Sequence, residues 1–251
     1  MLTERRQEEI VRLVSEKGSI TVSELKEILN TSESTIRRDI TALDKEGRLT
    51  KVFGGAVAIH TQIAKKELSM LQKQELQTSE KQLIAQYAAA LIEPDDCVYL
   101  DAGTTTGWMI EYIRETRATY VTNALSHAKR LADRGFHVIL IGGELKSATD
   151  AIIGAEAVLN LQKYHFSKGF FGVNGVDRIG GFTTPDAREA MVKQTAVKNT
   201  QPEHRYFLST ASKFGEVYAI TFAGLESGVI LTEDQITELF PKSIRIVNVR
   251  Q

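Results

Sequence analysis

The sequence predicts an α/β protein in two unequal parts, a small helical N-terminal unit and a larger C-terminal unit built on a mostly parallel sheet. Three helical patterns and a glycine-containing hairpin pattern occupy the first part of the chain. A stretch rich in Gln, Lys and Glu follows, and after Pro94 short β-branched runs alternate with helical patterns. Such alternation is typical of a parallel sheet flanked by helices. The expected divisions are 1–60, a helical linker over 61–92, and 93–251.

The N-terminal unit begins with two amphipathic helices. Thr3 can cap the first helix, and Gly18 ends its pattern. Thr21 and Glu24 have the spacing of a capping box and start the second helix. The apolar positions recur at helical spacing in both, at Ile10, Leu13 and Val14 and then at Val22, Leu25, Ile28 and Leu29.

A third helix and a hairpin complete this unit. Ser32 can cap the helix, and Gly47 ends it. Its apolar positions are Ile36, Ile40 and Leu43. Two short strands, 49–52 and 56–59, flank Gly54-Gly55, a pair suited to a two-residue turn. Three helices and a hairpin in this order predict a winged helix-turn-helix.

The outward face of the third helix is basic and hydroxyl-bearing, with Ser34, Arg37, Arg38 and Thr41, and Arg48 and Lys51 extend the basic surface into the hairpin. An arginine fork can grip a phosphate or read a guanine. The alternative is a pair of solvated arginines partly balanced by Asp39 and Asp44. The combination of helix spacing, basic face and hairpin favours double-stranded DNA as the partner.

The bulk composition limits the other possibilities. The net charge of −1 means that DNA contact must come from locally placed basic residues. Cys97 is the sole cysteine, so no disulfide can form within one chain. The N-terminus is charged, and no apolar run is long enough to span a bilayer. We therefore expect a cytoplasmic protein without a membrane partner.

Seven short runs are expected to form the sheet of the C-terminal unit, at 97–100, 119–122, 138–141, 169–173, 205–208, 229–231 and 244–249. A Gly/Thr loop follows the first of them and opens a helix. Its candidate ligand-binding residues are Asp101, Gly103, Thr104, Thr105 and Thr106. Backbone N–H groups, threonine hydroxyls and the helix dipole would converge there on an anion such as phosphate. The alternative is an ordinary tight turn with a threonine cap.

Other polar residues follow the expected strands, where ligands of open α/β sheets bind. The candidates are Asn123, Gly143, Asn174 and Lys213, the last to neutralise a phosphate. Glu189 and Lys193 lie four residues apart on a predicted helix and either reach a sugar or pair with each other. Since Asp101 would repel a phosphate, it is better suited to accept hydrogen bonds from sugar hydroxyls or to cap the loop.

These residues resemble a known family. The segments 32–40 and 47–56 resemble the DeoR family of repressors, whose recognition helix carries a Thr-Ile-Arg-Arg-Asp core. The resemblance implies that Arg37 and Arg38 contact DNA, that Ser34 and Thr35 help to dock the helix, and that Arg6 belongs with Ile10 and Val14 to the family's first helix.

The segments 101–105, 142–143, 171–176, 181–185 and 212–215 resemble the DeoR-type sensor domain. That resemblance implies a fold related to ribose-5-phosphate isomerase and a sugar-phosphate inducer. It is most similar to the fructose-operon repressors, which answer to fructose 1-phosphate, and next to the lactose phosphotransferase repressors. The expected function is a transcriptional repressor of a sugar-utilisation operon.

An enzyme is the main alternative, with Glu189 or Asp186 as a base, but no spacing singles out either residue. The five histidines lack metal-ligand spacing, and no Gly-x-Ser-x-Gly motif occurs. We therefore expect no catalysis, no metal and no cofactor. Because one recognition helix reads few base pairs, we expect a homodimer or a homotetramer. The operator, the effector and any activating role stay open.

Overall fold

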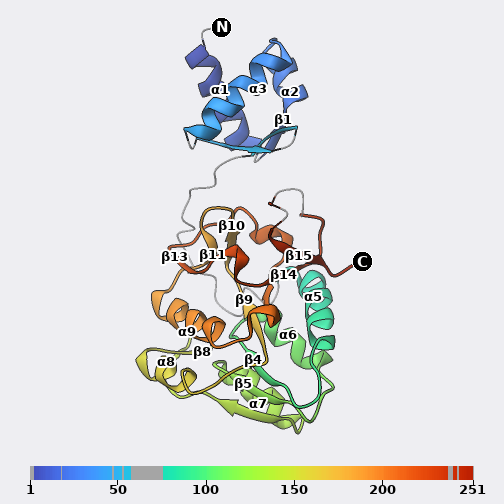
Figure 1. Ribbon diagram of the computed structural model, residues 1–251, viewed down its shortest axis with the longest axis vertical. Coiled ribbons are helices and arrows are strands. Elements are labelled where there is room, and N and C mark those ends of the chain that lie inside the picture. The colour runs from blue at the N-terminus through green and yellow to red at the C-terminus, as the bar shows by residue number, and fades with distance from the viewer. Residues whose placement is uncertain are drawn as a thin grey trace. The chain divides into compact units, whose positions relative to one another are not determined.

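The computed structural model describes residues 3–17, 19–46, 48–52, 54–57, 76–236, 240–241 and 243–250. The chain divides into two compact units, Met1–Thr61 and Gln62–Gln251, and Figure 1 labels many of their elements. Each unit has its own hydrophobic core and is described by itself.

The N-terminal unit is the predicted winged helix-turn-helix. Its helices are α1 (Thr3–Lys17), α2 (Val22–Ile28) and α3 (Glu33–Lys45). The hydroxyl of Ser32 accepts a hydrogen bond from the Thr35 N–H, and Thr21 and Glu24 form the expected capping box. Gly18 and Gly47, the predicted helix ends, lie outside the described residues.

The wing is a small antiparallel sheet in the order β1-β3-β2, with β1 at Ser19–Thr21, β2 at Thr50–Val52 and β3 at Gly55–Val57. The hairpin of β2 and β3 was expected, although residues 58–59 of its second strand lie outside the described residues. The sequence analysis missed β1, which pairs with β3. A Cβ on Gly55 would lie 2.3 Å from the Ile20 carbonyl oxygen, so glycine permits the close approach of these two strands.

The C-terminal unit is built on a seven-stranded, fully parallel sheet in the order β15-β14-β12-β9-β4-β5-β6. All seven predicted strands are present, with ends shifted by at most one residue. They are β4 (Cys97–Leu100), β5 (Thr119–Thr122), β6 (His137–Leu140), β9 (Lys168–Gly172), β12 (Arg205–Leu208), β14 (Val229–Thr232) and β15 (Arg245–Asn248).

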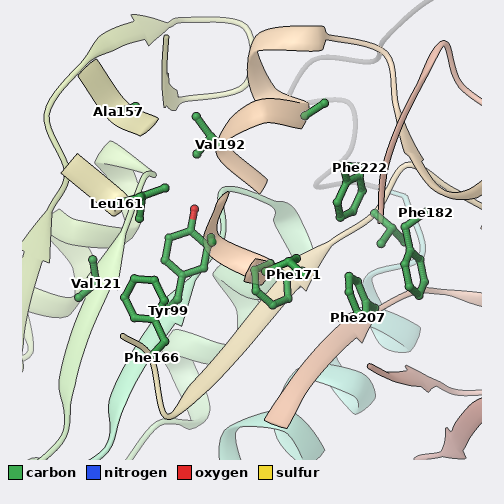
Figure 2. Packing of buried hydrophobic residues seen from close by; sticks show 14 of the residues in the cluster. Tyr99, Val121, Ala157, Leu161, Phe166, Phe171, Phe182, Val192, Phe207 and Phe222 are labelled. Carbon is green, nitrogen blue, oxygen red and sulfur yellow. The ribbon is translucent and has the colours of Figure 1, made fainter. Parts of the chain in front are cut away.

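Alternate residues of these strands point into two separate cores. On one face, Val98, Leu100 and their neighbours pack on the helices α5 (Thr78–Ala90), α6 (Thr104–Tyr112) and α7 (Leu125–Asp133). On the other face, Tyr99 and Phe171 pack with α8 (Ala155–Leu161) and α9 (Ala187–Lys198). Figure 2 shows the rings of this second core, where Phe182 stacks on Phe207 with centroids 3.8 Å apart. Because helices cover both faces of the sheet, side chains that point to either face are buried. Successive residues of its inner strands are therefore apolar.

Two smaller sheets add elements that the sequence analysis did not separate. The strands β7 (Glu144–Lys146) and β8 (Ala151–Ile153) form an antiparallel pair. The other sheet has the order β10-β11-β13, with β10 at Gly175–Asp177, β11 at Gly181–Thr184 and β13 at Ile220–Ala223.

The described part of the expected helical linker is an integral part of the C-terminal unit. Helix α5 buries Ile84, Ala85 and Ala88 against α6 and the sheet. The apolar residues of the expected linker are concentrated in its C-terminal half, so that half forms an amphipathic helix that packs on the sheet. Residues 61–75 of the expected linker belong to an interval, 58–75, that the structure does not describe. Within the described helices, none combines the length and the apolar character needed to cross a membrane.

Candidate DNA-binding surface and effector cavity

The outward face of α3 carries the predicted DNA-contact residues. Ser34, Arg37 and Arg38 are exposed, and Thr35 is half-buried beside the Ser32 cap. Arg37 pairs with Glu33 one turn earlier, with Nη2 and Oε1 2.6 Å apart. Arg38 forms no ion pair with any residue that the structure describes. The surface therefore offers guanidinium groups on an exposed helix face, as contact with DNA requires.

Asp39 does not balance the two arginines, contrary to the alternative interpretation. It is 2% exposed and faces α1, where Arg6 Nε lies 2.6 Å from Oδ2 and Arg6 Nη2 lies 3.2 Å from Oδ1. This contact raises the pKa of Arg6, mainly through the hydrogen bond to Asp39. The pair fixes α3 on α1 and leaves the exposed face of α3 to its basic side chains.

The wing residues predicted to extend the basic surface are also exposed. Arg48 lies 3.7 Å from a Glu46 oxygen. Lys51 Nζ donates to the Thr41 hydroxyl at 2.9 Å, and the Lys51 backbone N–H donates to Asp44 Oδ1 at 2.8 Å. Asp44 therefore holds the wing strand β2 against α3 and, like Asp39, has a structural partner of its own.

A cavity of about 370 Å³ opens at the carboxyl ends of β4 and β9 in the C-terminal unit. It brings together seven of the predicted effector residues, namely Gly103, Thr104, Thr105, Asn174, Glu189, Lys193 and Lys213. This is the edge of the sheet at which open α/β folds bind ligands.

One wall of the cavity is the first turn of α6. The helix starts at Gly103 without a side-chain cap, so its first N–H groups have no capping side chain as partner. The Thr105 hydroxyl is buried and has no hydrogen-bond partner among the described residues. Lys213 also lines the cavity, and its Nζ donates to the Val173 carbonyl at 2.7 Å. This arrangement of donors is suited to an anion.

A buried ion pair lies beneath the cavity. Asp101 is fully buried, and its Oδ2 accepts hydrogen bonds from Lys193 Nζ and, at 2.9 Å, from the Gly172 N–H. Burial raises the pKa of Asp101, and Lys193 opposes that rise. Asp101 does not itself line the cavity but contacts Lys193, which does. Its role as an acceptor for sugar hydroxyls or as a cap of the loop stays a prediction.

Glu189 and Lys193 do not pair with each other. Glu189 Oε1 accepts hydrogen bonds from Lys146 at 3.0 Å and from the Thr149 hydroxyl at 2.5 Å. Lys193 pairs with Asp101 instead. Both side chains line the cavity from successive turns of α9. Their four-residue spacing therefore places them on the same side of the helix without pairing them.

Three more predicted effector residues, besides Asp101, do not line the cavity. The Thr106 hydroxyl donates back to the Asp101 carbonyl at 2.7 Å. Asn123 Oδ1 accepts from the Tyr99 hydroxyl at 3.0 Å and from the Ala102 N–H at 2.8 Å, which fixes the start of the Gly/Thr loop. Gly143 has φ +148° and packs against β8, where a Cβ would meet Ile153 O at 2.8 Å. These residues contact the Gly/Thr loop or the strand β8 and do not contribute to the cavity lining.

The cavity also contains residues that the sequence analysis missed. They include Gln77, Lys81, Thr149, Ser212, Glu216 and Tyr218. Lys81 is 3% exposed and donates to the Leu76 carbonyl at 2.6 Å, and the Ser212 hydroxyl donates to Gln77 at 2.8 Å. No local motif distinguishes Lys81 within its Lys- and Gln-rich stretch, so only the packing of α5 reveals its position.

A buried histidine lies close to the same loop on α7. Burial, followed by the charge of Arg130, lowers the pKa of His127 from 6.5 to about 4, while Asp150 and the Gly103 backbone oppose the shift. Between these pH values the unfolded chain binds more protons at His127 than the folded chain does. The stability that the neutral His127 contributes is therefore fully present above pH 6.5 and is lost as the pH falls toward 4.

We expect this loss to reach about 3 kcal/mol. Urea unfolding of the wild type and of His127→Leu, followed from pH 7 downward, measures it as the difference between the two pH profiles. The exposed His165→Leu serves as the control variant. Parallel profiles for wild type and His127→Leu would contradict the assignment.

The comparisons with known proteins now bear on both units. Residues 6–62 match the DeoR-like helix-turn-helix domain, and residues 76–235 match the DeoR C terminal sensor domain. The chain belongs to the DeoR family. The two matched regions of this DeoR-family chain contain the basic face of α3 and every lining residue given above for the cavity.

Two relatives within the DeoR family align over most of their length. A Bacillus subtilis protein named "Uncharacterized HTH-type transcriptional regulator FruR" is 41% identical over 235 residues, 93% of this chain and 92% of that protein. A lactose phosphotransferase system repressor of Staphylococcus aureus is 38% identical over 223 residues, 88% and 87% of the two chains. The fructose and lactose branch named by the sequence analysis is thus supported.

Solved structures similar to this DeoR-family chain include ribose 5-phosphate isomerase A from Neisseria gonorrhoeae. It has a TM-score of 0.39 and 11% identity, with 53% of this chain and 52% of that chain covered. A likeness of this strength supports no conclusion about activity.

Proposed function

We propose that this DeoR-family protein is a sequence-specific repressor of a sugar-utilisation operon that a phosphorylated sugar induces. The observation that carries the proposal is the uncapped first turn of α6 beside a cavity that lysines line, where the Thr105 hydroxyl has no hydrogen-bond partner among the described residues. The names of the relatives, FruR and lactose phosphotransferase system repressor, favour a sugar-related signal. Fructose 1-phosphate is the first candidate effector.

The residues that line the cavity are of two chemical kinds. The phosphate would lie at the first turn of α6, where the Thr105 hydroxyl and the charges of Lys213 and Lys81 favour a dianion. Glu189 and Asn174 offer acceptors for sugar hydroxyls, and Lys193 adds a further donor. Groups for a phosphate together with groups for hydroxyls are what a sugar phosphate would need.

Induction would act through the segment that enters the C-terminal unit. Leu76 and Gln77 line the cavity and are the first residues described after the interval that leads from the DNA-binding unit. A ligand that contacts them differently in two arrangements of a homodimer or homotetramer would favour one arrangement. Paired recognition helices would then lose the spacing that an operator demands.

The contacts of the two acidic residues near the cavity, Glu189 and Asp186, fit ligand binding better than catalysis. Glu189 and Asp186, the two conceivable bases, both pair with Lys146, at 3.0 and 3.1 Å. Asp186 also caps the N-terminus of α9. The named relatives are transcription regulators, which fits a cavity that binds without reacting.

Replacing Arg38 with alanine should weaken operator binding by about 1–3 kcal/mol if the side chain reads a base, and Arg37→Ala should do the same. Fluorescence anisotropy on an operator fragment selected from random-sequence DNA measures the loss. Arg117→Ala, on the exposed surface of the C-terminal unit, is the control. Full operator affinity in both α3 variants would remove α3 as the reading element.

Fructose 1-phosphate should raise the thermal stability of the protein, by about 2.7 kcal/mol at a hundred times its Kd, because it binds only the native state. Thr105→Val should weaken that binding by about 1.5–3 kcal/mol, since it removes a hydrogen bond to a charged group. Thr221→Val, at an exposed position, should bind like the wild type.

The same ligand should release the operator in the anisotropy assay. Thr105→Val should keep its operator affinity and need more ligand for release. If no sugar phosphate changes either the thermal stability or the operator affinity, the sensor half of the proposal fails and the DNA-binding half remains.

A further inference from the structure

A second cavity, of about 400 Å³, opens on the other side of the Gly103-Thr104 turn, between α6 and α7. Its volume falls within the range of small-molecule sites. Among the described residues, Gly103 and Thr104 are the ones that it shares with the effector cavity. The remaining lining residues are Gly107, Trp108, Glu111, Ser126, His127 and Arg130.

His127 is the residue that the function proposed above does not use. Its side chain is 1% exposed and lines the cavity, and neither ring nitrogen makes a well-formed hydrogen bond to a described residue. The Gly103 backbone supplies only a weak interaction with the ring. A buried polar group without a partner costs free energy, and native proteins rarely keep one without a reason. A ligand in this cavity would supply the missing partners.

Gly107 provides the room for this imidazole. A Cβ at Gly107 would lie 2.9 Å from His127 Nε2 and 3.5 Å from an Arg130 nitrogen. The position has ordinary helical geometry inside α6, where alanine is the better helix former. Glycine here therefore preserves the space beside His127 at the expense of helix propensity.

The lining groups are polar but carry no net charge. Arg130 pairs with Glu111 across the cavity at 2.8 Å, and His127 is neutral near pH 7 because burial lowers its pKa to about 4. Ser126 and Thr104 add hydroxyl groups, and Trp108 adds a partly buried indole. Donors and acceptors are thus mixed beside an aromatic surface.

We propose that this second cavity binds a neutral, hydroxylated ligand of monosaccharide size. Hydroxyl groups act both as donors and as acceptors, so they suit the neutral His127 ring and can bond to Arg130 and Glu111 without disturbing their pairing. The apolar face of a sugar ring packs against an indole such as that of Trp108. An anion fits less well, because Glu111 would repel it and Arg130 is already paired.

Trp108 is the only tryptophan in the chain, so its fluorescence reports on this cavity directly. The probes are unphosphorylated D-fructose, D-glucose and D-galactose, added at millimolar concentrations to the full-length protein. We expect a saturable change in Trp108 emission with at least one of them. The apparent Kd should rise at least tenfold in His127→Leu and stay unchanged in His165→Leu.

Two further variants make the test specific. Gly107→Ala, which places a methyl group against His127 and leaves the polar groups intact, should weaken sugar binding as His127→Leu does. Lys213→Ala should leave it unchanged, because Lys213 lines only the effector cavity. Retained stabilisation by fructose 1-phosphate in His127→Leu would confirm that the variant is folded.

Four results would overturn the proposal. They are no saturable change with any of the three sugars, an unchanged Kd in both His127→Leu and Gly107→Ala, loss of the signal in Lys213→Ala, and saturable binding of inorganic phosphate that His127→Leu abolishes. The third result would move the sugar to the effector cavity, and the fourth would make this an anion site. None of these results changes the expected thermal stabilisation by fructose 1-phosphate, so the proposed function is tested separately.

Discussion

Replacing Lys193 with methionine should lower the free energy of unfolding of the C-terminal unit by about 3–5 kcal/mol. The substitution keeps most of the side-chain volume, so the loss comes from the charge. Lys193 is 5% exposed, and it pairs with Asp101, which is fully buried and has one oxygen without a partner among the described residues. Removing the ammonium leaves a buried carboxylate whose pKa burial already raises.

Chemical unfolding followed by circular dichroism measures this effect, with Lys198→Met as the matched control on the exposed last turn of α9. The control should change the stability by less than about 0.5 kcal/mol. The double variant Asp101→Asn, Lys193→Met should recover part of the loss, because no unpaired charge remains buried. A double variant no more stable than Lys193→Met alone would show that packing, and not charge, is the main contribution of the pair.

The same substitution should also weaken fructose 1-phosphate binding, since Lys193 lines the effector cavity. Thermal shifts at saturating ligand separate the two effects, because the loss of intrinsic stability appears without ligand and the loss of affinity only with it. The pair thus couples the stability of the unit to the shape of its ligand site.

Local patterns were sufficient to predict most of the fold. The capping box at Thr21 and Glu24 and the cap at Ser32 are interactions within one helical turn, so the sequence specifies them directly. The seven strands were found because each reads as a short apolar, β-branched or aromatic run; the five inner strands are buried on both faces, whereas the edge strands β6 and β15 are only partly buried. The Gly/Thr loop was found because it lies between a strand and a helix.

Long-range pairs were beyond such reasoning. Asp39 lies next to Arg38 in the sequence, yet its partner is Arg6, 33 residues earlier. Lys193 is one helical turn from Glu189, yet its partner is Asp101, 92 residues away. Local spacing suggested the nearer partner in both cases, and burial in the folded chain selected the distant one. Lys81 reaches the cavity for the same reason, through the packing of α5 on α6.

The Arg6–Asp39 pair leads to the second large prediction. Asp39→Ala should destabilise the N-terminal unit by about 3–5 kcal/mol, because it leaves the guanidinium of Arg6, which is 12% exposed, without its carboxylate and frees α3 from α1. A small domain has little stability in reserve, so the unit should be largely unfolded. Operator binding should be lost although Asp39 does not face the exposed side of α3.

Glu9→Ala, which breaks an exposed pair with Arg12 on the same helix α1, is the control and should bind the operator like the wild type. Stabilisation by fructose 1-phosphate should persist in Asp39→Ala, since the effector cavity lies wholly in the other unit. Asp39→Ala with wild-type stability and operator affinity would contradict the structural role of the pair. Lost operator affinity with a stable N-terminal unit would instead mean that Asp39 orients α3 for DNA without contributing to its folding.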